Sequence, residues 1–489
     1  MTRHTSRMLT IASLALAALF FSSSSCQETP PEPPKTDPTI YTKDSTYDAK
    51  IYLRNEYMNQ YYYWYKQVIQ QNNQLNAANY DIYEFFDKML YSADRWSWMC
   101  DKEYYVSSET GTYTGTWGVS LTQATDYYGS YAIRVAYIHP GSPFEKYGVT
   151  RGAMMTHIGG KYIGENLATG DYFDGAKLQN FNTEYAKSSN TFTFRLADGR
   201  DTSFSASRAT SLKTNSYIAA KIFTEKDFPG LTRPVGYFNY LSFLNNFIND
   251  VSNNMEMFHD AGIKDLILDL RYNGGGDSRV SDRLINYLAP ASAQGEVYVK
   301  RVHNDLLASY DEESRIGRYP KSLDLENLYV ITGQGTASAS ELVINGLKPH
   351  MNVKMVGDTT YGKPNGMYVL MYPGDDASYA KYNKDDYSTL EWVFLPICFY
   401  NKNGKGESIP DSGFVPDCYR ADDPFHDFTP EEASIKACLT HLVSGNYPEP
   451  PAVSMTRAGT PRGVDAKLEP VKNDPHYGLY TVRREFSAK

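Results

Sequence analysis

The stretch from Leu328 to Lys363 constrains the fold of this chain more than any other. It opens on an apolar, β-branched run, Leu328–Thr332, which has the length and composition of a buried strand. The turn Gly333-Gln-Gly335 breaks this run, and from Ala339 the apolar and small residues recur with helical spacing. The pattern predicts a strand, a tight turn and a helix, with Ser338 in the first helical turn. Backbone N–H groups are unpaired there, and the positive end of the helix dipole favours an anion.

A lysine follows at the end of the next predicted strand and loop. Val353–Val356 is a second apolar strand that leads into the loop Gly357–Lys363. A serine hydroxyl is a poor nucleophile until a base takes its proton, and a lysine can be that base only if burial lowers its pKa from about 10.4 towards about 7–8. A shift of that size costs roughly 3–5 kcal/mol, so a catalytic lysine needs a dry, shaped loop. Gly362 and Pro364 are compatible with one.

Ser338-Ala-Ser-Glu341 and Gly362-Lys363 together resemble the S-A-S-E and G-K motifs of the C-terminal processing peptidases. These are tail-specific serine proteases with a Ser/Lys dyad and an embedded PDZ domain. The serine and the lysine are 25 residues apart (363 minus 338), which is also the spacing in that family. The resemblance implies Ser338, rather than Ser340, as the nucleophile and Lys363 as its base. The alternative is that Thr336, Ser338 and Ser340 only cap a helix and that Lys363 is a solvated loop cation.

Length and charge narrow the class of protein. With 489 residues, 41% of them hydrophobic, the chain is long enough for roughly two to four domains with sizeable cores. Its formal net charge is −9 and it has no long Lys/Arg run, which argues against a nucleic-acid partner. The nine histidines are scattered and the cysteines after Cys26 form no C-x-x-C pair, so no metal site is predicted. Disulfides and buried free thiols both stay open for Cys100, Cys398, Cys418 and Cys438.

Residues 1–26 are predicted to be a targeting segment. Arg3 and Arg7 precede the apolar run Met8–Phe21, which is too short to span a membrane as a mature helix. The serines and Cys26 that follow resemble the lipobox of bacterial lipoproteins, which implies that Cys26 becomes the lipidated N-terminus. An ordinary signal peptide cleaved nearby is the alternative. The proline-rich residues 27–45 are predicted to be an extended tether, so the expected location is the cell envelope, lipid-anchored and facing the periplasm or the cell surface.

Two further segments precede the region of the motifs. In residues 46–100, aromatic and apolar side chains recur at helical intervals, which predicts a small helical cap on the main domain. Residues 101–210 change to short strands and turns, and Phe192–Leu196 with Thr202–Ala206 predicts a hairpin.

The segment 101–210 also resembles a PDZ domain. Trp117–Leu121 resembles the carboxylate-binding loop of these domains, and Gly141–Gly152 followed by Met154–Gly160 resembles their helix and the next strand. In such a loop, successive N–H groups would hold a chain-terminal carboxylate while the peptide adds as a strand to the sheet edge. The residues implied are Gly118, Val119, Ser120 and Leu121.

The catalytic core is expected over residues 211–445. A predicted helix around Leu244–Phe258 and a buried strand, Lys264–Leu270, lead into Arg271-Tyr-Asn-Gly-Gly-Gly-Asp277. This loop resembles the family's D-L-R-x-N-P-G-G, with Gly274 in place of the proline, and the resemblance implies that the N–H groups of Ala339 and of Gly275 or Gly276 hold an oxyanion. A phosphate-binding loop is excluded because no G-K-[ST] follows. Asp269 and Arg271 are interpreted as a structural ion pair, with an acid–base pair as the alternative.

The chain after Lys363 is predicted to contain strands over Met367–Tyr372 and Trp392–Tyr400 and a last helix over Glu431–Leu442, before a tail at 446–489. Gly413–Asp417 resembles the family's closing G-x-x-P-D element. Met367 stands where the family often carries a glutamine that fixes the direction of the lysine. Tyr361 or Asn365 is expected to supply that contact instead.

The fold class expected is α/β, in an α+β multidomain arrangement. The resemblance implies a helical cap, a PDZ-like β-rich domain and a core like that of the crotonase and Clp protease folds. It also implies a serine endopeptidase that needs no cofactor and cleaves exported polypeptides near their C-termini through an acyl-enzyme. Its other partner would be the membrane, through the lipid anchor. The alternative is a non-catalytic PDZ lipoprotein that binds exported proteins or glycans.

Overall fold

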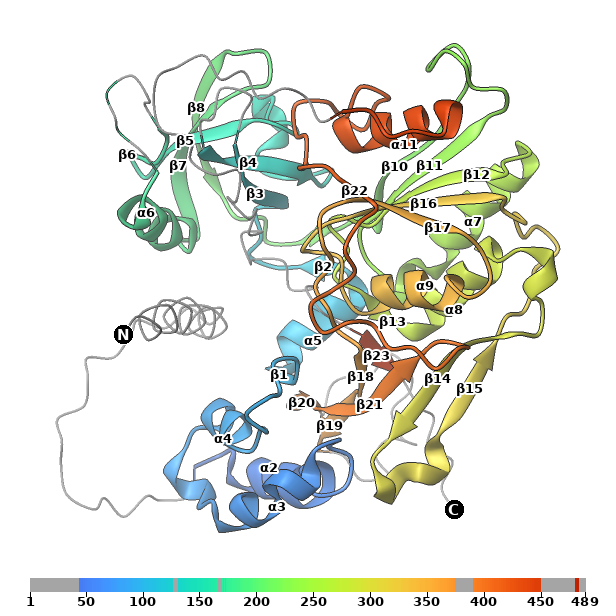
Figure 1. Ribbon diagram of the computed structural model, residues 1–489. Coiled ribbons are helices and arrows are strands. Elements are labelled where there is room, and N and C mark those ends of the chain that lie inside the picture. The colour runs from blue at the N-terminus through green and yellow to red at the C-terminus, as the bar shows by residue number, and fades with distance from the viewer. Residues whose placement is uncertain are drawn as a thin grey trace, which may run out of the picture. The chain divides into compact units, whose positions relative to one another are not determined.

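A computed structural model of the chain describes residues 44–125, 131–165, 169, 171, 173–373, 390–449 and 480–482. The predicted targeting segment with Cys26, most of the tether and most of the tail 446–489 lie outside these residues. The described residues from Ser45 onward belong to one compact unit. They combine helices with several sheets, so the predicted α/β class is confirmed (Figure 1). The domain boundaries and the crotonase-like core stay predictions.

The 211–445 region is built around a six-stranded sheet in the order β10-β11-β12-β16-β17-β22. Neighbouring strands are parallel except for β10 and β11, which are antiparallel. The predicted strands at 264–270, 328–332 and 353–356 are confirmed as β12, β16 and β17. The bounds are β10 Tyr217–Phe223, β11 Val235–Tyr240, β12 Asp265–Asp269, β16 Asn327–Thr332, β17 Val353–Gly357 and β22 Cys418–Tyr419.

Helices cover both faces of this sheet (Figure 1). Because successive strand residues point to opposite faces, Leu266 and Leu268 of β12 pack in the core with α7, α8 and α9, while Ile267 packs with α11. Because helices cover both faces of the sheet, all five residues of β12 are buried. The bounds are α7 Ile248–Asp260, α8 Ser278–Leu288, α9 Ala339–Leu347 and α11 Ala433–Ser444, with short 3₁₀ turns at Asn245–Phe247 and Ala291–Ala293.

Two further sheets contain the strands β18, β19, β20 and β21, which follow Lys363 in the sequence. One has the order β13-β23-β18-β21-β14-β15 and the other β1-β20-β19. The predicted single strands 367–372 and 392–400 are each split, at Val369 and at Pro396, and their halves join different sheets. Proline has no N–H to donate to a ladder, which explains the second break. The bounds are β1 Trp98–Asp101, β13 Gly276–Asp277, β14 Val297–His303, β15 Glu312–Arg315, β18 Asn365–Tyr368, β19 Leu370–Tyr372, β20 Trp392–Leu395, β21 Ile397–Lys402 and β23 Tyr480–Val482, with a 3₁₀ segment at Asp305–Tyr310.

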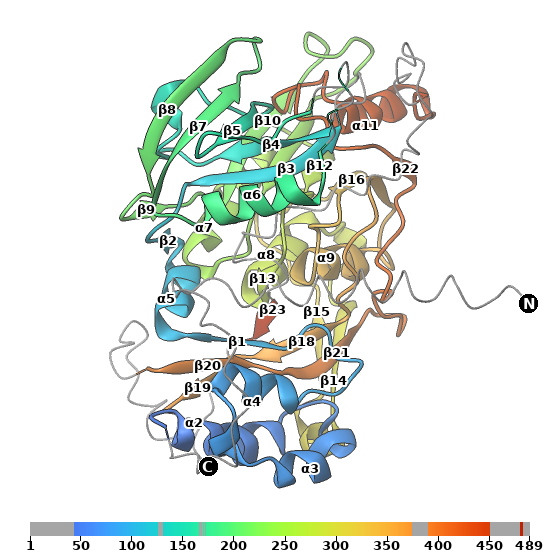
Figure 2. The ribbon, with the colours of Figure 1, turned by 90° about the vertical axis from the view of Figure 1, so that its left-hand side faces the viewer.

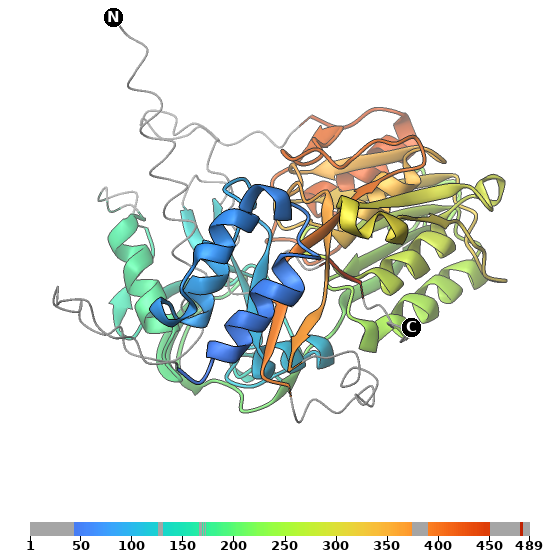
Figure 3. The ribbon, with the colours of Figure 1, turned by 90° about the horizontal axis from the view of Figure 1, so that it is seen from below.

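The N-terminal segment is helical, as predicted, and packs on the three-stranded sheet (Figure 3). The rings of Tyr57 and Phe86 lie 6.2 and 6.4 Å from the ring of Phe394 in β20, so the aromatic stripe of this segment is core. The helices are α2 Tyr47–Tyr52, a π-helical turn Leu53–Met58, α3 Tyr65–Gln74, a 3₁₀ turn Ala77–Asn79 and α4 Ile82–Lys88.

The expectation of only strands and turns after residue 101 is wrong at its start, where α5 spans Lys102–Thr110. The side chain of Asp101 caps this helix by accepting from the Tyr104 N–H at 2.8 Å, and Gly111 ends it with a φ of 65°. Both end signals are local, but the helix has little apolar periodicity that could have revealed it.

A six-stranded antiparallel sheet, in the order β3-β4-β5-β7-β8 with β6 paired to β5, follows α5 (Figure 2). Its core is aromatic and includes Trp117, Phe144, Phe192 and Phe204. The predicted hairpin is confirmed as β7 and β8, in which Phe192 pairs with Phe204. The bounds are β2 Thr112–Tyr113, β3 Val119–Thr125, β4 Tyr131–Ile138, β5 Met154–Ile158, β6 Lys161–Tyr162, α6 Gly175–Tyr185, β7 Ser189–Arg195, β8 Asp201–Ser207 and β9 Leu212–Lys213, with a 3₁₀ turn at Glu145–Tyr147.

Candidate active site

Ser338 lies at the junction between β16 and α9, immediately before the first residue of the helix. It is the N-cap of α9 and has φ 59° and ψ −111°, so the expectation of a place inside the first turn is wrong. A positive φ at a residue other than glycine costs on the order of 1–3 kcal/mol and persists only where surrounding contacts fix it. Two backbone contacts do so: the Ser338 N–H donates to Glu341 Oε2 at 2.9 Å, and its carbonyl accepts from the Leu342 N–H at 2.8 Å.

The two neighbouring serines differ in what their hydroxyls do. Ser340 Oγ donates to the carbonyl of Asn273 at 2.9 Å, so this hydroxyl is hydrogen-bonded to the glycine loop. Ser338 Oγ is buried and has no hydrogen-bond partner among the residues that the structure describes. A buried hydroxyl without a hydrogen-bond partner lowers the stability of the fold. Such a hydroxyl is expected of a reacting group more than of a structural one.

Lys363 lies in the loop between β17 and β18 and is almost fully buried. Burial lowers its pKa to about 7, although the carboxylates of Asp94 and Glu341 oppose that shift. Its ammonium nitrogen is 3.7 Å from Met367 Sδ, so the methionine itself contacts the lysine. Within the described ranges no hydrogen bond joins the Asn365 amide to Lys363, so this predicted contact is not made.

Glu341 connects the serine to the lysine loop. Its Oε2 accepts from the N–H groups of both Ser338 and Lys363, each at 2.9 Å. Its Oε1 accepts from the Gly362 N–H at 2.7 Å and from Thr360 Oγ1 at 2.6 Å. The carboxyl group is fully buried, and burial raises its pKa while these four donors lower it. Glu341 is part of the quoted motif, yet its spacing alone did not reveal that it holds both candidate residues.

The glycine loop after β12 provides the candidate oxyanion donors. The Gly275 N–H donates to Asn273 Oδ1 at 2.9 Å, and Gly276 pairs with Tyr480 of β23 and forms a bridge with Phe243. Gly276 has a φ of 140°, and a Cβ there would collide with the carbonyl oxygen of Phe243, so only glycine fits. Ala339, the first residue of α9, presents an N–H at the helix N-terminus.

A cavity opens beside this loop. Gly276 and Asp277 line it together with side chains from β1, α5, β20 and the segment after β11. The cavity is small, and about half of the residues that line it have aromatic or aliphatic side chains. The other lining residues are Trp98, Tyr105, Ser108, Glu109, Phe243, Leu244, Asn245 and Leu395.

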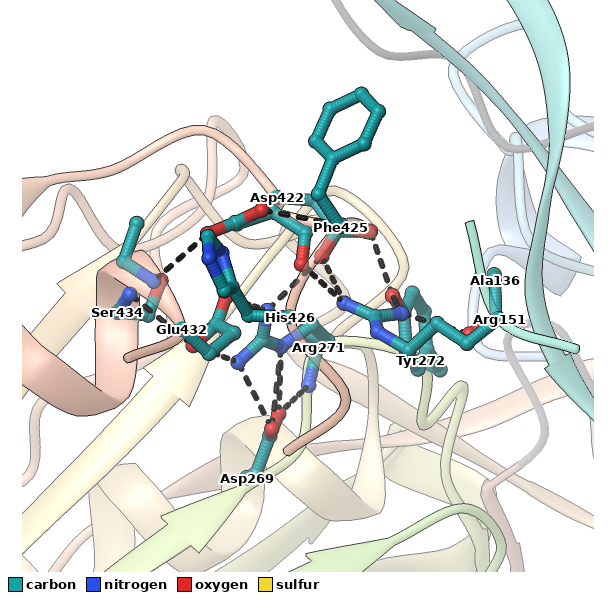
Figure 4. Close-up of polar contacts among 12 residues, drawn as sticks. Ala136, Arg151, Asp269, Arg271, Tyr272, Asp422, Phe425, His426, Glu432 and Ser434 are labelled. Atoms are coloured by element: carbon teal, nitrogen blue, oxygen red, sulfur yellow. Dashed lines mark hydrogen bonds and ion pairs between the residues drawn. The ribbon is translucent and has the colours of Figure 1, made fainter. Parts of the chain in front are cut away.

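Asp269 and Arg271 form a structural ion pair, which confirms the interpretation made from sequence (Figure 4). Both side chains are buried, and Arg271 also makes two hydrogen bonds with Glu432 at 2.6 and 3.0 Å and one with Asp422 at 2.9 Å. Asp422 in turn accepts at 2.8 Å from Arg151, which lies in the β3–β8 region. A network in which every charge is paired supports the glycine loop rather than proton transfer.

The predicted peptide-binding residues lie at the start of β3. Val119, Ser120 and Leu121 are strand residues rather than loop residues, and only Gly118, with a φ of 64°, precedes the strand. The Gly118 N–H donates to Thr116 Oγ1 at 3.1 Å. β3 is an edge strand of its sheet, so its outer side faces no other strand in the described part of the chain.

Sequence reasoning missed the turn that precedes β1. Arg95 Nη2 donates to the carbonyl of Gly362 at 2.9 Å, across 267 positions of sequence. No local pattern marks such a contact.

The described residues are predicted to hold no metal site, and the sequence leaves the pairing of their cysteines open. They contain no group of His, Cys, Asp and Glu side chains that could hold a metal ion. Cys100, Cys398, Cys418 and Cys438 are buried free thiols, which resolves the alternative left open for them. No helix within the described ranges is both long and apolar enough to cross a bilayer.

The chain is similar to known proteins in sequence and in fold. The family model "Peptidase family S41" matches residues 234–391. A protein named "Probable CtpA-like serine protease" from Staphylococcus saprophyticus is 25% identical over 172 residues, 35% of this chain and 32% of that protein. One of the same name from Staphylococcus aureus is 26% identical over 156 residues, 31% of this chain and 30% of the other. The chain thus aligns with about a third of the length of these curated relatives.

A solved structure extends the likeness of fold. The crystal structure of a chain named as an S41 protease, from Bacteroides fragilis NCTC 9343, superposes with a TM-score of 0.62 at 20% identity, over 84% of this chain and 100% of that one. The residues that match the family model include Ser338, Lys363 and the candidate oxyanion donors. Residues 234–391 thus match peptidase family S41, and the relatives that align with this chain are named as CtpA-like serine proteases.

Proposed function

We propose that this chain is a serine endopeptidase with Ser338 as nucleophile and Lys363 as general base. The observation that carries the proposal is the shared carboxylate: Glu341 fixes the backbone of both residues. The state of the two side chains supports it. Ser338 Oγ has no hydrogen-bond partner in the described residues, and burial brings the pKa of Lys363 to about 7, within the range of a general base at neutral pH.

The proposed reaction passes through an ester on Ser338. The neutral amine of Lys363 takes the proton of Ser338 Oγ while that oxygen bonds to the carbonyl carbon of the substrate peptide. The carbonyl oxygen becomes an oxyanion, to which the N–H groups of Ala339 and of Gly275 or Gly276 donate. The C–N bond then breaks, and the Lys363 ammonium returns its proton to the leaving amine. Water that has lost a proton to Lys363 attacks the ester, the Oγ–C bond breaks, and Ser338 regains its proton.

Exported polypeptides, cut near their C-termini, are the proposed substrates. The support is the resemblance to tail-specific peptidases together with the edge position of β3, to which a peptide could add as a strand. If Gly118–Leu121 hold a terminal carboxylate, amidation of a peptide C-terminus should weaken its binding by roughly 1.5–3 kcal/mol, the worth of a hydrogen bond to a charged group. Equal binding of the acid and amide forms would assign this strand a structural role.

Lipid anchoring at Cys26 is proposed from the sequence alone, since Cys26 lies outside the described residues. When bacteria produce the chain in medium with labelled palmitate, the protein should then carry the label. Cys26→Ala should abolish the label and release the protein from the membrane fraction. Release of the wild-type chain in soluble form would favour an ordinary signal peptide.

The test of the activity is cleavage of a denatured protein and of a tail-bearing peptide. Ser338→Ala and Lys363→Ala should each abolish turnover, and the double variant should be no worse than either, because the two groups act as a unit. The free energy of unfolding of Ser338→Ala should change by no more than about 1–2 kcal/mol. Ser340→Ala is the control. Because Ser338 is the proposed nucleophile, this variant should keep measurable turnover. Substantial turnover by Ser338→Ala would reject the assignment, and peptide binding without turnover by the wild type would favour the binding-protein alternative.

A further inference from the structure

The turn between α4 and β1 is rigidly built. Asp94 Oδ1 accepts from the N–H groups of Trp96 and Ser97 at 2.9 and 3.0 Å, and Asp94 Oδ2 accepts from the hydroxyl of Tyr62 at 2.7 Å. The Ser97 hydroxyl also accepts from the N–H of Ile397, which begins β21. These bonds fix the turn both to the helical segment and to the sheet that follows the lysine. They determine where the side chain of Arg95 lies.

Arg95 bridges two loops of the peptidase region. Its Nη2 donates to the carbonyl of Gly362 at 2.9 Å and also to the carbonyl of Asp411. The guanidinium lies over two rings, 4.8 Å from the centroid of Trp96 and 5.5 Å from that of Tyr361. The two loops are in close contact, because a Cβ at Gly362 would collide with the carbonyl of Asp411. One cation therefore joins two carbonyl oxygens whose dipoles would otherwise repel each other.

The peptide unit between Gly362 and Lys363 is held at both of its polar atoms. Its carbonyl accepts from Arg95, and its N–H donates to Glu341 Oε2 at 2.9 Å. A peptide unit is planar, so fixing its oxygen and its nitrogen fixes the plane from which the Lys363 Cα–Cβ bond leaves. The direction of the lysine side chain thus depends on a cation from the N-terminal segment and an anion from α9.

We propose that Arg95 is a positioning residue for Lys363, so that the turn at 94–97 is part of the peptidase site. This inference rests on the proposed function of Lys363. The exposed position of Arg95 supports a role other than core packing, since its loss opens no cavity. The carboxylate of Asp94 also acts on the lysine, whose pKa it raises against the effect of burial.

Arg95→Ala is the direct test, measured as kcat and KM for a peptide that the wild type cleaves. The turnover number should fall about 10–100-fold, the loss usual for groups that orient a reacting side chain, while KM stays within about threefold. Arg95→Lys should recover only part of the loss, because an ammonium lacks the planar guanidinium that lies over the rings of Trp96 and Tyr361. Millimolar methylguanidinium should restore part of the activity of Arg95→Ala, which a general loss of folding would not allow.

Arg54→Ala is the matched control. Arg54 also donates a guanidinium N–H to a backbone carbonyl of the helical segment, that of Leu75 at 3.2 Å, with no contact to the lysine loop among the described residues. Its kcat should match the wild type. Equal kcat for Arg95→Ala and wild type, or a loss that methylguanidinium and Arg95→Lys both fail to relieve, would overturn the proposal.

A second readout separates this inference from the function on which it rests. The rate at which acetic anhydride acetylates Lys363, followed by peptide mass spectrometry, needs no turnover. It should rise several-fold in Arg95→Ala as the loop loosens, and not in Arg54→Ala. If the wild type shows no turnover that depends on Ser338 but this difference persists, the peptidase assignment fails and the positioning contact stands. If acetylation is the same in all three proteins, the positioning role is refuted.

Discussion

The N–H groups of Ser338 and Lys363 donate to the same oxygen atom, Oε2 of Glu341, each at 2.9 Å. A serine at the start of α9 and a lysine in the loop after β17 are thereby fixed relative to each other through their backbones, before either side chain makes a contact. This arrangement explains how a residue with a positive φ is maintained at Ser338. It also leaves the serine hydroxyl uncommitted.

Glu341→Gln should be severely impaired although it keeps the shape of the side chain. A glutamine offers one oxygen and one NH₂ group where four donors converge, so at least one donor meets another donor. The free energy of unfolding should fall by about 1–3 kcal/mol and kcat by about a hundredfold or more. Ser281→Ala, which removes a buried hydroxyl that donates to the Ser278 carbonyl, is the control in urea unfolding and peptide cleavage. A kcat equal to that of the wild type in Glu341→Gln would show that the shared carboxylate does not fix the placement of Ser338 relative to Lys363.

The rate of peptide cleavage should depend on the ionisation of Lys363. The reactive form is the neutral amine, and the pKa is about 7, so kcat/KM should rise with pH through about 7 and level off above it. A rise centred near the pKa of an ordinary lysine would contradict a buried base.

The same shift predicts a dependence of stability on pH. Between pH 7 and about 10.4 the unfolded chain binds a proton at Lys363 that the folded chain does not, so this residue's contribution makes the protein less stable as the pH falls through that window. Lys363→Met removes that contribution and should be more stable than the wild type at pH 7 by roughly 3–5 kcal/mol at most, with the difference shrinking towards pH 10. Chemical unfolding at several pH values measures it, and a difference independent of pH would contradict the shift.

Arg271→Met should destabilise the protein strongly, because it leaves Asp269 and Glu432 buried without their main partner. Loss of one partner of a buried network costs about 3–5 kcal/mol. Arg195→Met, which breaks an exposed pair with Asp201, should cost no more than about 1 kcal/mol and is the control. Urea midpoints of the two variants compare them directly, and similar values would mean that the network of Figure 4 contributes little.

Local patterns predicted the parts of the site that depend on neighbours in sequence. The strands β12 and β16, the start of α9 within a few residues and the β7–β8 hairpin all follow from apolar periodicity and turn residues. The positive φ of Ser338 could not be predicted, since it depends on Glu341 and on the packing of the whole junction. The contact from Arg95 to Gly362 could not be predicted either, because it joins segments that only the tertiary fold brings together.

Met367 offers the last test of how the lysine is controlled. Its sulfur lies 3.7 Å from the Lys363 nitrogen, and a thioether is a weak acceptor that hardly favours the charged ammonium over the neutral amine. In Met367→Gln, an amide oxygen at that place would accept from the ammonium and stabilise the charged form, so the pKa of Lys363 should rise above about 7.

Better orientation and a higher pKa have opposite effects on the rate at pH 7. The net change in kcat/KM for Met367→Gln should therefore stay below about tenfold, while the rise with pH moves to higher pH. Met367→Leu is the control, since it removes the sulfur without adding an acceptor and should leave the pH profile in place. A rate increase near a hundredfold in Met367→Gln would mean that the natural residue leaves the lysine poorly oriented, and the interpretation of the chain as a peptide-binding protein would gain support.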